Sequence, residues 1–92
     1  MNLRKLAKGQ DCQVRIVGVC NFNPETTVLA HLRMAGLSGM GIKASDVFGA
    51  WCCSACHSYV DTHTGDDRVA LDFLRGVMRT QAKLLEMGAL AA

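Results

Sequence analysis

Two pairs of cysteines are the residues of this chain best suited to chemistry. Cys53 and Cys56 form a C-x-x-C step, which brings two thiolates to one metal ion. Cys12 and Cys20 stand at the ends of the segment CQVRIVGVC and can supply a second pair. We therefore predict a structural zinc site of four thiolates, which leaves no open position for catalysis. Buried free cysteines and a redox-active C-x-x-C pair are the alternatives, and Cys52, out of register with the pair, is interpreted as a packing residue.

The histidines form a second group of candidates. His57 directly follows Cys56, and Asp61 lies four residues further on. If a helix begins near Cys53, these two side chains share one face, and an imidazole with a carboxylate can hold a divalent cation. Taken singly, each of these residues is more often an ordinary surface or capping residue. His31 lies in the segment TTVLAHL.

Local patterns predict the elements that position these residues. Residues 12–20 alternate apolar and polar side chains and then reach a glycine, which predicts a short strand with a tight reversal. Residues 26–32 predict a strand that carries His31 near its end, with a helix as the rival interpretation. The three glycines in residues 36–41 predict a loop, and they lack the Lys-Ser/Thr pair of a phosphate-binding fingerprint.

Residues 66–87 predict an amphipathic helix, because their apolar positions recur near a period of 3.6. Asp66 and Asp67 favour its N-terminal end, and Gly88 supplies a stop. Gly76 costs a helix interior about 1 kcal/mol relative to alanine, so it predicts a kink or close packing. The chain thus contains a knuckle, which is the segment 12–20 closed by Cys12 and Cys20, then a strand pair, then a helix that begins with C-x-x-C. This is the order of a treble-clef zinc module, which is a small α+β fold.

Length and composition limit the remaining choices. The 92 residues are enough for a single domain over residues 1–92, and only 5% of them are aromatic. A structural zinc site, which adds about 10–16 kcal/mol of apparent folding free energy, would compensate for the missing rings. We find neither a signal-peptide pattern nor a membrane span, which predicts a cytoplasmic protein with reduced thiols.

The charge is divided unevenly along the chain. The formal net charge is +2, but residues 1–43 hold six basic and two acidic side chains. The basic residues of the front end could follow the phosphates of a nucleic acid, with an ordinary solvated face as the alternative. They include Arg4, Lys5, Lys8 and Arg15.

The combined pattern resembles a known class of enzymes. AHL at residues 30–32, the glycine-rich loop and CSACHSYVD at 53–61 resemble the HNH, or ββα-metal, endonuclease module. The longer pattern from CQVRIVGVC through NPETTVLAHLR to CSACH is similar to the YbcO family, small nucleases encoded in lambdoid prophages. This resemblance covers about residues 4–85, and its combined spacing is more specific than any single motif.

The resemblance implies roles for individual residues. His31 matches the general base, which takes a proton from the water that attacks phosphorus. His57 matches the metal-binding histidine of the module's last helix, and Asp61 stands where many members place a second helical ligand. Mg²⁺ or Mn²⁺ bound there would polarise the scissile phosphate. The four cysteines match the zinc scaffold of some HNH members.

Two positions depart from the family pattern. Many HNH enzymes have an Asp or His metal ligand just before the general base, where this chain has Ala30. The module's middle Asn is not evident either. Asp46 is the nearest polar candidate, and it is equally compatible with a catalytic role and with a helix cap. His63 is a reserve ligand if the helix is irregular.

The sequence thus favours a metal-dependent endonuclease that hydrolyses DNA phosphodiester bonds, with His31 as general base. A non-catalytic, zinc-stabilised nucleic-acid-binding module is the first alternative, and a purely structural or protein-interaction role is the second. DNA is the expected partner. A homodimer would suit an enzyme that must cut both strands.

Overall fold

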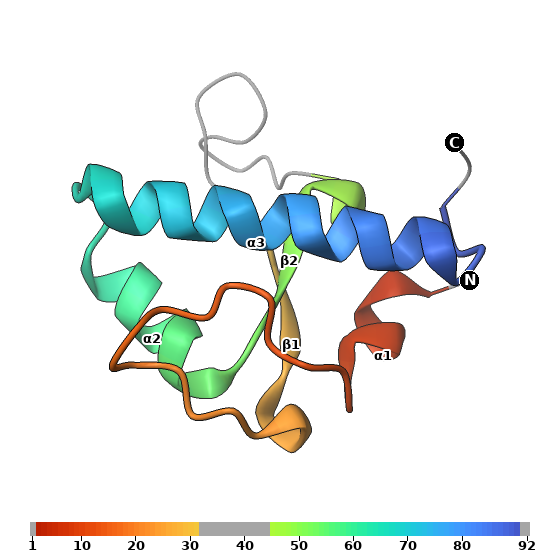
Figure 1. The fold of residues 1–92 in the computed structure, drawn as a ribbon, viewed down its shortest axis with the longest axis horizontal. Coiled ribbons are helices and arrows are strands. Elements are labelled where there is room, and N and C mark those ends of the chain that lie inside the picture. The colour runs from red at the N-terminus through yellow and green to blue at the C-terminus, as the bar shows by residue number, and fades with distance from the viewer. Residues whose placement is uncertain (1, 32–44, 91–92) are drawn as a thin grey trace.

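Helices surround a small antiparallel sheet in this protein (Figure 1). The computed structural model describes residues 2–31 and 45–90. These form a two-stranded sheet with three α-helices and two 3₁₀ helices. In chain order the elements are α1 (Leu3–Ala7), η1 (Pro24–Thr26), β1 (Val28–His31), η2 (Asp46–Phe48), β2 (Gly49–Cys52), α2 (Ser54–Thr62) and α3 (Asp67–Glu86).

The two strands form an antiparallel pair whose register sets the layout of the molecule. Val28 pairs with Cys52 at one end, and His31 pairs with Gly49 at the other. The strand predicted over residues 26–32 is confirmed as β1, and the rival helix is wrong. His31 therefore lies at the end of the sheet opposite to the point where β2 leads into α2.

Helix α3 is the long helix that the periodicity predicts. The Asp66 carboxylate caps its start by accepting from the backbone N–H of Arg68 and Val69. Gly88 follows its end with φ of +72°, the left-handed conformation that glycine adopts without strain. Its buried face packs across β2, as Figure 1 shows.

Gly76 allows this packing to be close. A Cβ added there would lie 2.7 Å from Cγ2 and 3.0 Å from Cα of Val14. Since α3 runs as one helix from Asp67 to Glu86, the glycine marks close contact with the backbone of residues 12–20 rather than an interruption.

The core has two parts. Trp51, 2% exposed, packs with Ala7, Leu29 and Leu84 near α1. The other part contains most of the cysteines, together with the apolar residues of the 12–20 segment and of α3. Figure 1 places α1 and α2 on opposite sides of the sheet, so each part is closed by one short helix.

The strand predicted within residues 12–20 is wrong, because the backbone there turns too sharply. Arg15 and Gly18 have φ of +51° and +78°, values incompatible with an extended strand. The N–H groups of Val19 and Cys20 both donate to the carbonyl of Ile16, which closes a turn. The knuckle between the two cysteines is thus formed without a strand.

Two further expectations concern the glycine-rich loop and the absence of a membrane span. The predicted glycine loop of residues 36–41 lies outside the described residues. Within residues 2–31 and 45–90, no helix combines the length and hydropathy needed to cross a membrane.

Candidate functional site

The sulfur atoms of four cysteines meet at one point. The Sγ atoms of Cys12, Cys20, Cys53 and Cys56 all lie within 4.8 Å of one another. The first two flank the turn of the knuckle, Cys53 is the N-cap of α2, and Cys56 lies in its first turn. Three of the four are buried, and Cys20 is half-buried. The fold thus brings together the two pairs that the sequence suggested.

The dimensions of this cluster fit a zinc ion. Four sulfurs at about 2.3 Å from a tetrahedral Zn²⁺ lie about 3.8 Å from one another. The Sγ atoms of Cys20 and Cys53 are 3.8 Å apart, and all the cysteines are free thiols rather than disulfides. Sulfur donors in this number select zinc or another thiophilic ion, so the cluster is suited to a closed structural site.

The thiols of the cluster titrate unequally. A hydrogen bond from the Cys52 thiol lowers the pKa of Cys12 to about 4, while burial raises the pKa of Cys20 to about 11. Burial also raises the pKa of Cys56. Cys52 is fully buried in the core beside the cluster, as the packing interpretation predicts, and it is not one of the four cysteines.

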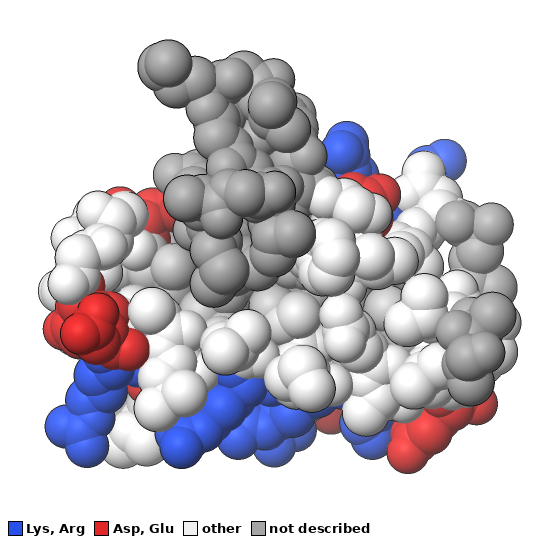
Figure 2. Space-filling view, turned by 90° about the horizontal axis from the view of Figure 1, so that it is seen from above, with Lys and Arg blue, Asp and Glu red and all other residues white. Residues whose placement is uncertain are grey.

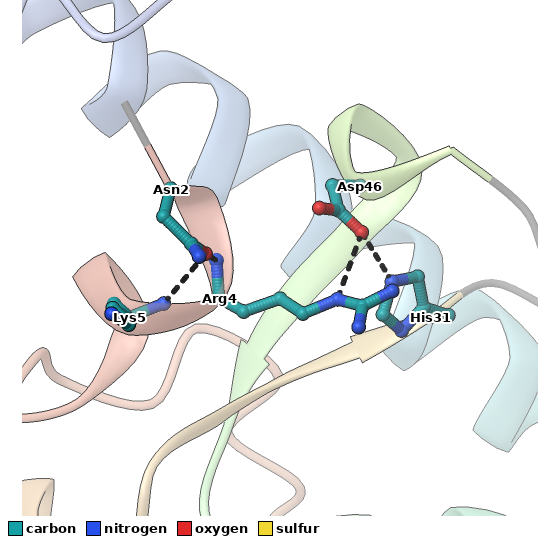
Figure 3. A network of polar contacts seen from close by, with 5 residues as sticks. All are labelled: Asn2, Arg4, Lys5, His31 and Asp46. Atoms are coloured by element: carbon teal, nitrogen blue, oxygen red, sulfur yellow. Dashed lines mark hydrogen bonds and ion pairs between the residues drawn. The ribbon is translucent and has the colours of Figure 1, made fainter.

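A second group of polar side chains lies at the far end of β1 (Figure 3). Nε2 of His31 is 2.6 Å from Oδ1 of Asp46, the first residue of η2. Nε of Arg4, on α1, lies 3.3 Å from the same oxygen. Asn2 caps α1 by accepting from the backbone N–H groups of Arg4 and Lys5, which fixes the start of the helix that carries the arginine.

The electrostatics of this group favour a charged Asp46. The hydrogen bond from His31, together with the nearby Arg4 guanidinium, holds the pKa of Asp46 below its usual range. The helix-cap interpretation of Asp46 is wrong, because Ser45 is the N-cap of η2 and the carboxylate turns to His31. An imidazole that donates through Nε2 keeps Nδ1 as an acceptor, which is the state a general base requires.

An open groove adjoins this group. Its volume is about 590 Å³, and it runs between the start of α1 and η2. The side chains of His31 and Asp46 are 23% and 36% exposed, so water and a substrate can reach the pair. The groove is lined by Asn2, Leu3, Arg4, Ser45, Asp46 and Val47.

The other candidate pair lies on α2. Nε2 of His57 is 3.7 Å from Oδ2 of Asp61, and both side chains are about two-fifths exposed. His63 follows the end of α2, where its ring stacks on Tyr59 at 3.8 Å between centroids. Within the described part of the chain, only the four cysteines bring three or more metal-binding side chains together. The α2 pair therefore provides two donors, fewer than the three usual at a catalytic metal.

The structure separates the His31–Asp46 pair from the His57–Asp61 pair. His31 is opposite Gly49, whereas α2 begins beyond Cys52 at the other end of β2. At about 3.3 Å per residue, the three steps along β2 alone amount to on the order of 10 Å. His31 thus meets Asp46, and His57 meets Asp61, so the candidate base and the candidate metal ligands do not form one centre.

Comparison with known proteins identifies the family. The model of the family described as "Putative nuclease YbcO" matches residues 1–89. The chain is 50% identical over 94 aligned positions to "Putative nuclease YbcO" of Escherichia coli (strain K12), covering 99% of this chain and 98% of that protein. A protein of Enterobacteria phage 82, "Putative nuclease ybcO", matches with the same identity and coverage. The chain belongs to the YbcO family.

A solved structure agrees with this assignment. The YbcO-family chain superposes on "Structure of a putative bacteriophage protein from Escherichia coli str. K-12 substr. MG1655" with a TM-score of 0.76. The two are 44% identical, and the match covers 95% of this chain and 100% of that one. The family description supports a nuclease function in general, and the relative in phage 82 supports a phage connection.

For this YbcO-family chain, the sequence indicates His31 and Asp46 as candidates but gives no signal for the position of Arg4. From the sequence alone, Arg4 is one member of a basic front end. Its contact with Asp46 joins residues 42 apart, and no local pattern signals such a contact. Only the packing of α1 beside η2 and β1 brings the guanidinium to the carboxylate.

Proposed function

We propose that this protein is a metal-dependent DNA endonuclease in which His31 is the general base and Asp46 orients it. The observation that carries the proposal is the 2.6 Å contact between Nε2 of His31 and Oδ1 of Asp46, beside an open groove. A carboxylate that accepts from one imidazole nitrogen fixes the ring and stabilises the charge it gains on taking a proton. This is the chemistry required for activating water at a phosphodiester.

The proposed reaction assigns one task to each side chain. Nδ1 of His31 takes a proton from a water molecule, whose oxygen then attacks phosphorus as the P–O ester bond breaks. The leaving oxygen keeps the electron pair of that bond and takes a proton from solvent. Asp46, already ionised, stabilises the resulting imidazolium. Arg4 lies at the edge of the same group, and its terminal NH groups can contact a phosphate oxygen while Nε stays near Asp46.

His57 and Asp61 are the proposed holders of the divalent cation, either Mg²⁺ or Mn²⁺. A bound cation would neutralise charge on a phosphate of the DNA. Because the register places these residues on the order of 10 Å or more from His31, that phosphate would differ from the one that His31 attacks, and the cation would position the strand. The metal role and the base role are therefore separate claims that need separate tests.

The four cysteines have a structural role in this proposal. A knuckle, an antiparallel strand pair and a helix that starts with C-x-x-C occur in the order of a treble-clef zinc module. Zinc bound there would join the 12–20 segment to the first turn of α2 and hold the HNH-like arrangement of strands and helix. With four thiolates the ion has no vacant position, so it would not take part in the reaction.

Cleavage of supercoiled plasmid by zinc-loaded protein tests the metal claim. We expect nicking only when Mg²⁺ or Mn²⁺ is added, and we expect His57→Gln with Asp61→Asn to need a higher metal concentration. His63→Gln is the matched control, because it alters a histidine next to α2 outside the proposed pair. Cutting that proceeds without added divalent metal, in protein of confirmed zinc content, contradicts metal dependence.

A non-catalytic DNA-binding module is the second candidate, and the basic face of α3 favours it. Arg68, Arg75, Arg79 and Lys83 recur at seven- and four-residue steps, so they share one side of the helix. Figure 2 shows Lys and Arg gathered along one edge of the molecule, where phosphates could bind. Binding that weakens steeply with salt while DNA remains uncut would favour this candidate.

A further inference from the structure

Helix α3 presents an apolar row to solvent in addition to its buried face. Leu71, Leu74, Met78 and Leu85 are 46%, 41%, 61% and 44% exposed. Their spacing of three, four and seven residues places them on one side of the helix. The basic residues of α3 flank this row on one side, and in Figure 2 the edge of Lys and Arg is bordered by uncharged surface. The row is the largest series of exposed apolar side chains on one described element.

The spacing of the row is symmetric about Met78. Leu71 and Leu85 each lie seven residues from it, and Leu74 and Ala82 each lie four residues from it. Two copies of α3 packed antiparallel about this residue would set Leu71 against Leu85 of the other copy. Leu74 would meet Ala82, a large side chain on a small one, and the two Met78 side chains would meet at the two-fold axis. A self-complementary surface of this kind is what a symmetric dimer needs.

The charges beside the row include one contact that favours this pairing and one that opposes it. Arg68 lies ten residues before Met78, and Glu86 lies eight residues after it. In the antiparallel arrangement these two side chains from different copies differ by two residues in height, about 3 Å along the axis. The symmetry repeats this contact, so each dimer would contain two such ion pairs. Arg75 and Arg79 of different copies also differ by two residues in height, so their like charges weaken the pair. A parallel pairing would leave Arg68 and Glu86 at opposite ends of the two helices.

We propose that the apolar row of α3 binds a second copy of this chain, antiparallel about Met78. Two helices in contact over this length bury on the order of 1,000 Å² in total, at the lower end for specific complexes. The association is therefore weak and depends on protein concentration. A two-fold axis perpendicular to both helices leaves their basic sides facing the same way, so the dimer joins the two basic edges into one surface.

Sedimentation of the full-length, zinc-loaded chain under reducing conditions tests the proposal without DNA or cleavage. We expect a monomer–dimer equilibrium, and we expect Met78→Glu to raise the dimer dissociation constant at least about tenfold, because two carboxylates then face each other. Met87→Glu is the matched control, since Met87 is 45% exposed but follows the end of α3. It should leave the constant unchanged.

Charge reversal tests the orientation of the two helices. Arg68→Glu and Glu86→Arg should each weaken the dimer several-fold, and the double variant should recover most of the loss. Circular dichroism and zinc content confirm that each variant is folded. A chain that stays monomeric up to about 1 mM overturns the proposal. So does a dimer that Met78→Glu leaves intact, or a double variant no tighter than the single ones.

Discussion

Nε2 of His31 lies 2.6 Å from Oδ1 of Asp46, although fifteen residues separate the two in sequence. The histidine ends β1, and the aspartate begins the short helix that leads into β2, so pairing of the two strands holds both ends of the contact. Arg4 approaches the same oxygen from α1. Three elements therefore fix the orientation of one imidazole, which is the arrangement that a general base needs.

Replacing Asp46 tests whether this contact orients the base. Asp46→Asn keeps the size of the side chain but removes the charge that stabilises the imidazolium, so we expect cleavage to fall at least about tenfold. DNA affinity should change little, because the carboxylate does not itself contact DNA in the proposal. Measured cleavage rates and filter-binding affinities check this result. Equal rates for the variant and the wild type would mean that the carboxylate has no part in catalysis.

The cysteine cluster predicts a contrast between neighbouring residues. Cys53→Ser removes one of the four sulfurs, so we expect zinc affinity to fall more than about a hundredfold and the melting temperature to drop. Cys52→Ser leaves all four in place and should still bind one equivalent of zinc. Metal analysis and thermal unfolding of both variants provide the comparison. Loss of zinc from the Cys52 variant alone would assign the site to a different set of ligands.

Zinc binding by this cluster should depend on pH. The raised pKa values of Cys20, about 11, and of Cys56 mean that both thiols are protonated at neutral pH before metal binds. Binding must release at least these two protons, so the affinity should rise at least about a hundredfold per pH unit near neutrality. Competition with a chelating dye at about pH 6 and about pH 7 measures the slope. An affinity independent of pH would show that thiolates are already present.

Gly76 should resist substitution by alanine, despite the higher helix propensity of alanine. The added Cβ would meet the backbone of Val14 at 3.0 Å, which cannot move away as a flexible side chain would. We expect a net loss of about 1–3 kcal/mol in the free energy of unfolding. Gly65→Ala is the control, because a Cβ there meets no atom within 4 Å. Chemical denaturation of both variants measures the difference, and a stabilised Gly76→Ala would refute the close contact.

Several elements could be predicted from the sequence because their signals are local. The period of α3 and its capping residues, Asp66 and Gly88, define both ends of that helix. The C-x-x-C spacing likewise indicates the start of α2 and half of the cysteine cluster. The alternation in residues 12–20 predicts a strand wrongly, because the positive φ of Arg15 depends on its contacts rather than on its residue type. The Arg15 side chain donates to the Cys12 carbonyl.

Other features depend on long-range packing and have no local signal. The antiparallel register decides that His31 is remote from the start of α2, and the sequence alone cannot fix a register between β1 and β2. For the same reason, the sequence alone does not distinguish a cap from a catalytic role for Asp46. Its contact with His31 depends on the pairing of the two strands.

The most direct test of the central claim is single-turnover cleavage of plasmid DNA by His31→Ala, with protein in excess. Each sample is first shown to hold one equivalent of zinc, and His63→Ala serves as the control. We expect His31→Ala to cut at least about a hundredfold more slowly than the wild type, with DNA affinity unchanged, while His63→Ala cuts normally. If His31→Ala cuts DNA as fast as the wild type, His31 is not the general base.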